Sequence, residues 1–222
     1  MRTRVKFCGL TSEKDIHDAV QAGADAVGLV LYEKSKRYVS LERAAVLRRE
    51  VPGLLSAVTL TVNADVTTIE AIMKSIGPDF IQFHGDESPQ YCEQFSYPYI
   101  RALRVGAPGL TTAADIAACV DSYPNASAFL FDAYSPGYGG AGISFDITLL
   151  AQAERILPRS KIVIAGGLNA ANIAALVTRY RPFAVDLSSG IEISPGEKSA
   201  GKMHSFMLAL SEADKLHRPT AL

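Results

Sequence analysis

The chain has few features that would tie it to a charged partner or to a metal. Its 222 residues include only three cysteines, and the formal net charge is −1. A nearly neutral chain gives no electrostatic reason to expect binding to nucleic acid or to an anionic membrane. Cys8, Cys92 and Cys119 lack metal-ligand spacing and cannot all pair with one another. We therefore expect no metal and a reduced, cytoplasmic environment.

Long apolar runs are also missing. No run reaches the length that a membrane span requires. The start of the chain is basic but passes directly into a strand pattern, without a signal-peptide core. No linker or low-complexity tract interrupts the sequence. Since 48% of the residues are hydrophobic and 20% are charged, a large core can be buried. We expect a single domain over residues 1–222 and leave its oligomeric state open.

Short apolar runs alternate with helical patterns along the whole chain. The runs are rich in β-branched residues, as is typical of strands buried on both faces. The predicted strands are Val5–Cys8, Ala26–Leu31, Leu55–Val62, Phe80–His84, Tyr99–Arg104, Ala128–Asp132, Ile162–Ala165 and Ala184–Leu187. The predicted helices begin near residues 11, 40, 65, 87, 111, 146, 169 and 199, each after a capping residue or a turn.

This alternation fits either a closed barrel of parallel strands or an open, doubly wound sheet. The first strand–helix turn, Cys8 to Thr11, lacks the spaced glycines of a dinucleotide fingerprint. Glycine-rich turns follow the last two strands instead, which is where α/β barrels bind phosphate. A single (β/α)8 barrel with parallel strands is therefore the predicted fold.

Two reactive side chains end predicted strands, where ligands bind in such folds. Cys8 precedes a helix whose N-terminus can lower the pKa of a thiol, although a lone cysteine is more often a small core residue. Asp132 ends an almost wholly apolar strand, and burial there favours the neutral form that a general acid needs. The alternative is an aspartate that braces the adjoining loop. Cys92 and Cys119 lie inside predicted helices among apolar neighbours, where they fit buried structural positions.

Four other polar residues are candidates for substrate binding. Arg37 lies in a polar loop after the second strand, and its planar guanidinium suits a carboxylate, although it fits a solvated loop charge as well. Gln82 and His84 alternate along the fourth strand and share one face, which suggests a lined pocket or a satisfied core histidine. Asp186 ends the eighth strand, where it can line the pocket or brace the next turn.

Three glycine turns follow consecutive strands, at residues 137–142, 165–169 and 186–190. Phosphate needs several N–H donors in one concave turn, which glycine permits because it has no side chain and tolerates positive φ. A carboxylate beside such turns indicates an enzyme that acts on a phosphorylated small molecule. The predicted phosphate-binding residues are Gly140, Ala141, Gly142, Gly166, Gly167, Ser188 and Ser189.

Seven segments in the same order resemble phosphoribosylanthranilate isomerases. They are residues 5–11, 22–30, 34–40, 82–87, 138–142, 165–169 and 183–192. The resemblance implies a TIM barrel that catalyses a cofactor-free Amadori rearrangement in tryptophan synthesis. It implies Cys8 as the catalytic cysteine, Asp132 as the catalytic aspartate and Arg37 as the residue that contacts the anthranilate.

The implied chemistry divides the work between an acid and a base. Protonated Asp132 opens the furanose ring by protonating its oxygen, and Cys8 as thiolate removes the proton from ribose C2. The chain departs from the family pattern mainly at Phe7, Phe83 and Ala141. A related barrel that also serves histidine synthesis would carry an aspartate at position 8, so Cys8 argues against it. The presence of Cys8, Asp132 and Arg37 together argues against a barrel that binds a phosphorylated metabolite as a regulator and has no catalytic activity.

Overall fold

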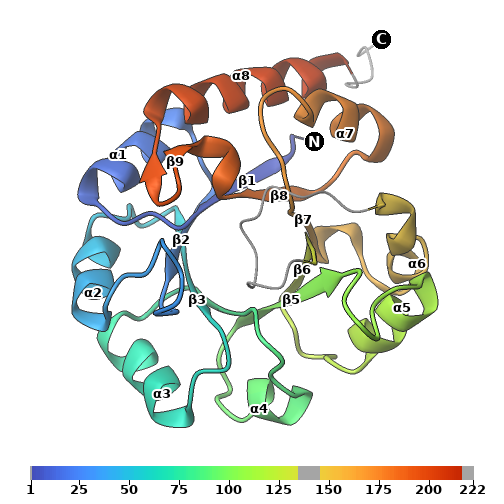
Figure 1. Cartoon of the computed structure of the whole chain (residues 1–222), viewed down its shortest axis with the longest axis horizontal. Helices are drawn as coiled ribbons and strands as arrows, with labels where there is room; N and C mark the ends of the chain where they lie inside the picture. Colours follow the sequence, from blue (N-terminus) through green and yellow to red (C-terminus); the bar gives the residue numbers. More distant parts are fainter. Residues whose placement is uncertain (1, 135–145, 217–222) are drawn as a thin grey trace.

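The structure is a computed structural model that describes residues 2–134 and 146–216, in which eight strands close into one barrel (Figure 1). Each strand pairs in parallel with the next, and β8 pairs with β1. The strands are β1 (Arg4–Cys8), β2 (Ala26–Val30), β3 (Ser56–Thr61), β4 (Phe80–Phe83), β5 (Tyr99–Val105), β6 (Ala128–Ala133), β7 (Ile162–Ile164) and β8 (Ala184–Leu187). The predicted fold is confirmed, and the open sheet is excluded.

Helices follow the strands and surround the barrel (Figure 1). They are α1 (Glu13–Ala22), α2 (Leu41–Arg49), α3 (Val66–Ser75), α4 (Pro89–Glu93), α5 (Ala113–Asp121), α6 (Ala153–Ile156), α7 (Ile173–Tyr180) and α8 (Ala200–Leu216). Side-chain caps set the first five starts: Ser12, Ser40, Asp65, Ser88 and Thr112 each accept a bond from the backbone three residues later. None of the helices in the described residues is both long and apolar enough to cross a bilayer.

Two helices differ from their predicted bounds. The helix expected from residue 146 is split into a 3-10 turn, η1 (Ile147–Leu150), and the short α6, because Asp146 accepts a bond from Thr148 and tightens the first turn. A further 3-10 turn, η2 (Arg159–Lys161), precedes β7. The helix expected from Asn169 begins at Ile173, because the Asn169 side chain bonds the Ala171 N–H and forms a separate turn.

A small hairpin that the sequence analysis did not predict follows β8. The chain passes through a 3-10 turn, η3 (Ser189–Ile191), and then forms the antiparallel strands β9 (Glu192–Ser194) and β10 (Glu197–Lys198). Gly196 turns the hairpin with φ +94°, and a Cβ at that position would lie 2.7 Å from the Lys36 carbonyl. The hairpin therefore packs closely against the loop between β2 and α2.

The core has an outer and an inner part. The large side chains fill the space between strands and helices, whereas Val58, Ile100, Ala102, Leu130 and Ala165 form a small cluster of their own. These five alternate along their strands and face the barrel axis. The same alternation turns a set of polar or reactive side chains inward, from the middle of the strands to just beyond their carboxyl ends: Lys6, Cys8, Gln82, His84, Asp132 and Asp186.

Candidate active site

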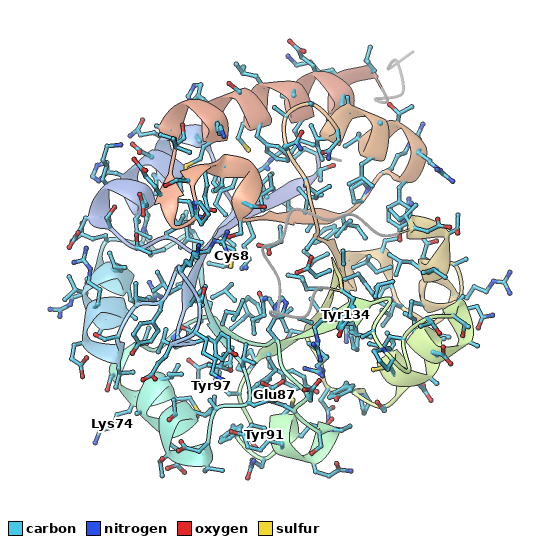
Figure 2. The ribbon with its side chains drawn as sticks, viewed as in Figure 1. Cys8, Lys74, Glu87, Tyr91, Tyr97 and Tyr134 are labelled. Atoms are coloured by element: carbon cyan, nitrogen blue, oxygen red, sulfur yellow. The ribbon has the colours of Figure 1, made fainter. Side chains whose placement is uncertain are left out.

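A cavity of about 460 Å³ opens among residues that follow the carboxyl ends of the strands. Seven of the predicted site residues line it together: Cys8, Arg37, His84, Asp132, Asp186, Ser188 and Ser189. Figure 2 shows Cys8 on the inner side of the barrel wall. Residues 33–38 and the β9–β10 hairpin bound the cavity on one side, since Lys34, Lys36, Ile193 and Pro195 also line it. Residues far apart in the sequence thus converge on one pocket.

Cys8 lies deeper than its sequence position suggested. Its side chain packs with Val30, Leu60 and Val62, and the residue is 4% exposed. Burial raises the pKa of the Cys8 thiol above its ordinary value, with Lys6 and Lys198 acting in the opposite direction. The expectation that the helix N-terminus lowers the pKa of this thiol is wrong, because the sulfur points into the barrel. The first turn of α1 is instead capped by Ser12 and Asp15.

A buried ion pair lies directly beside this thiol. Lys6 Nζ donates to Asp186 Oδ1 at 2.8 Å, and both side chains are less than 10% exposed. Burial alone would lower the pKa of Lys6, but the charges of Asp186 and Cys8 raise it to about 12. Asp186 therefore lines the pocket and holds a lysine, whereas its contact with substrate stays a prediction. Lys6 was not among the predicted site residues, although its alternation with Cys8 along one strand places both on the same face.

Asp132 lies beside His84 in the lining of the cavity. Asp132 Oδ1 accepts the Ala133 N–H at 2.9 Å, and His84 Nε2 lies 3.5 Å from Asp132 Oδ2. Gln82 Nε2 lies 2.9 Å from His84 Nδ1, on the side of the ring away from Asp132. Gln82 itself is fully buried and does not line the cavity. The predicted pair on the fourth strand is therefore bonded together, and its histidine lies beside Asp132 without a hydrogen bond to it in the described residues.

Arg37 already holds a carboxylate of the protein. Its Nε and Nη2 donate to the two oxygens of Glu192 at 2.7 Å each, and Lys198 Nζ donates to Glu192 Oε1 at 2.7 Å. Burial opposes the charge on Glu192, but these two cations lower its pKa overall. The Arg37 stem lies against Gly9, where a Cβ would be 2.5 Å from Arg37 Cδ. Glu192 and Lys198 were missed because the hairpin that carries them was not predicted.

The turns after β7 and β8 approach each other closely. Gly166 and Gly167 have φ of +89° and +64°, as expected for a glycine-dependent turn. A Cβ on Gly190 would lie only 1.9 Å from the Leu168 carbonyl oxygen. Within residues 2–134 and 146–216, no partner is recorded for the backbone N–H of Gly166, Gly167 or Ser189. The two turns can therefore donate to an anion.

A second cavity of about 480 Å³ adjoins these turns. It is lined by Gly167, Asn169, Ala170, Ala171, Ser189, Gly190, Lys202 and Ser205. The third predicted phosphate turn, Gly140, Ala141 and Gly142, lies outside the described residues. The described part of the chain contains no group of three or more His, Cys, Asp or Glu side chains placed to hold a metal.

Comparisons with known proteins agree with this architecture. The sequence pattern of the N-(5'-phosphoribosyl)anthranilate isomerase family matches residues 5–209. The N-(5'-phosphoribosyl)anthranilate isomerase of Bordetella avium is 51% identical over 214 residues, which are 96% of this chain and 98% of that protein. The chain belongs to the N-(5'-phosphoribosyl)anthranilate isomerase family. The resemblance expected from the seven segments is thereby confirmed.

Solved members of this isomerase family share the barrel. The phosphoribosyl anthranilate isomerase of Thermotoga maritima superposes with a TM-score of 0.83 at 33% identity, covering 95% of this chain and 99% of that one. A phosphoribosyl anthranilate isomerase in complex with reduced 1-(o-carboxyphenylamino)-1-deoxyribulose 5-phosphate superposes with a TM-score of 0.78 at 31% identity, again covering 95% and 99%. The ligand of that protein is a phosphorylated small molecule.

Proposed function

We propose that this isomerase works with Cys8 as general base and Asp132 as general acid. The reaction converts N-(5-phosphoribosyl)anthranilate to 1-(2-carboxyphenylamino)-1-deoxyribulose 5-phosphate in tryptophan biosynthesis. One observation carries the assignment: Cys8 and Asp132 come from β1 and β6 and line the same cavity at the strand ends. Active sites of (β/α)8 barrels lie at this face.

The first step is ring opening. Protonated Asp132 gives its proton to the furanose oxygen while the bond from that oxygen to C1 breaks, which leaves a protonated Schiff base between C1 and the anthranilate nitrogen. Asp132 is then a carboxylate, which the Ala133 N–H at 2.9 Å and the nearby His84 Nε2 stabilise. His84 would therefore stabilise the ionised acid Asp132 in addition to its predicted contact with the substrate.

The second step is proton removal from C2. The Cys8 thiolate takes this proton, and the electron pair of the C–H bond moves toward the Schiff base to give an enolamine, which tautomerises to the ketone. Each proton transfer contributes on the order of 10² to 10⁴ in rate. Acid and base must begin in opposite protonation states, as in other sites with paired roles.

Two groups of donors would orient the substrate. We assign the phosphate to the turns after β7 and β8, because Gly167 and Ser189 line the second cavity and their N–H groups have no backbone partner in the described residues. We assign the anthranilate carboxylate to Arg37, which has five N–H donors and uses two of them on Glu192. A crystal soaked with sulfate tests the first assignment, and an anion bound away from these turns would remove it.

Single substitutions test the acid and the base. We expect Cys8→Ala and Asp132→Ala each to lower kcat by at least about two orders of magnitude. Affinity for a reduced product analogue should stay nearly unchanged, because neither group is needed for ground-state binding. Near wild-type kcat in either variant would remove that residue from the mechanism.

A further inference from the structure

The buried position of Cys8 raises a problem for a general base. A base must be deprotonated to accept a proton, yet burial raises the pKa of this thiol. The N-terminus of α1 offers no help, since Asp15 accepts from the Thr11 and Ser12 N–H groups there. A nearby cation is the remaining way to favour the thiolate in an apolar pocket.

Lys6 lies where such a cation is needed. A Cβ built on Gly28 would lie 2.8 Å from Cys8 Sγ and 3.1 Å from Lys6 Nζ. The sulfur and the ammonium nitrogen therefore share one small space above the bare Cα of Gly28. Lys6 is 6% exposed, so water screens its charge weakly. Its other contact is the 2.8 Å bond to Asp186, which fixes the ammonium in this place.

We propose that Lys6 is a positioning residue for the base: its ammonium stabilises the Cys8 thiolate, and Asp186 holds that ammonium beside the sulfur. The inference rests on the proposed role of Cys8 and deepens it. During the reaction Lys6 keeps its proton. The thiol loses its proton to solvent before the substrate binds, and it gains the C2 proton afterwards.

Other charges near the thiol differ in their arrangement. Lys198 from β10 and Arg37 from the β2–α2 loop also act on Cys8, but both are bonded to the single carboxylate of Glu192, whose charge offsets part of theirs. Asp186 from β8 acts against the thiolate. His84 and Asp132 line the same cavity, and neither is among the charges that act on the Cys8 thiol. Lys6 and Asp186 should therefore shift the pKa of the Cys8 thiol in opposite directions, and this difference in sign can be tested with variants of the two residues.

The experiment compares three forms of the ligand-free protein: wild type, Asp186→Asn and the double variant Lys6→Met/Asp186→Asn. The double variant is needed because Lys6→Met alone would leave a buried carboxylate unpaired. Alkylation by iodoacetamide is followed against pH, with peptide mass spectrometry separating Cys8 from Cys92 and Cys119. The midpoint should fall in Asp186→Asn. In the double variant it should lie about one to three pH units above that of Asp186→Asn.

The lower limb of the pH profile of kcat/KM should move with these midpoints. If the role of Lys6 were purely structural, its replacement would lower stability or kcat without moving the lower limb of this pH profile. Equal midpoints in Asp186→Asn and the double variant overturn the proposal. If the double variant does not fold, Asp186→Asn tests the proposal alone, because the asparagine oxygen can still accept from Lys6 Nζ. An unchanged or raised midpoint in that variant then overturns the proposal. Wild-type turnover by Cys8→Ala would instead overturn the mechanism itself. If Cys8→Ala is inactive but the Cys8 midpoints of Asp186→Asn and the double variant are equal, only the role of Lys6 is overturned.

Discussion

Gly190→Ala should be one of the most damaging single-methyl changes in the chain. The added Cβ would lie 1.9 Å from the Leu168 carbonyl oxygen. Side-chain carbons are not found closer than 3.0 Å to such an atom, so the turns after β7 and β8 must separate by about 1 Å or more. Both contacting groups are backbone, so no flexible side chain can move aside to relieve the clash.

The expected cost has two parts. Forcing a methyl into a packed site lowers the free energy of unfolding by about 1–3 kcal/mol. Displacing the proposed phosphate donors by about 1 Å should lower kcat/KM by about 100-fold, because the phosphate orients the reacting ribose. Urea unfolding measures the first effect and steady-state kinetics the second. Calorimetric titration with inorganic phosphate reports directly on the anion site.

Gly53→Ala is the matched control. A Cβ on Gly53 meets no atom within 4 Å, and its backbone is not left-handed. This variant should keep wild-type kinetics and should be equally or slightly more stable, since alanine restricts the unfolded chain. A Gly190→Ala variant with the kinetics and stability of Gly53→Ala would refute the close approach of the two turns and the phosphate site built on it.

Charge and geometry at the cavity rim lead to the remaining predictions. Arg37→Lys keeps the charge but loses the planar guanidinium that can donate two parallel bonds, so this variant should clearly raise KM. Neutral replacements of Lys34 and Lys36 should be tolerated. Equal, mild losses at all three positions in steady-state kinetics would mean a diffuse charge effect. Glu192→Gln leaves the buried Lys198 and the half-buried Arg37 without their carboxylate and should cost about 3 kcal/mol by chemical unfolding near neutral pH. Because the pKa of Glu192 is lowered on folding, that difference should shrink as the pH falls below about 4.3, and a pH-independent difference would contradict the pairing.

The barrel could be predicted because its strands carry their own signal. Apolar runs such as Ala128–Asp132 can be recognised from their composition, and residues at the ends of such strands must meet at one face once the sheet closes. The position of Asp132 in the cavity follows from that rule alone. The start of α7 could not be predicted in the same way, since Asn169 fits a helix cap and a separate turn equally well.

Contacts between distant segments were beyond such rules. The β9–β10 hairpin has strands of three and two residues, too short for any period to show, yet it supplies Glu192 and Lys198. The titration of Cys8 was predicted in the wrong direction, because the helix rule considers only sequence neighbours. The closed barrel decides which atoms surround the sulfur, and these are the side chains of Val30, Leu60 and Val62.

The cavity therefore has two differently charged ends. Beside Cys8, Lys6 and Asp186 balance each other, so the pocket there carries no net charge until the thiol ionises. At the hairpin, two cations, Arg37 and Lys198, share the single carboxylate of Glu192 and leave one positive charge in excess. A substrate carboxylate would neutralise this excess without displacing Glu192, because Lys198 already holds one of its oxygens. The charge arrangement thus supports the proposed orientation, with the anthranilate at the hairpin and the ribose between Cys8 and Asp132.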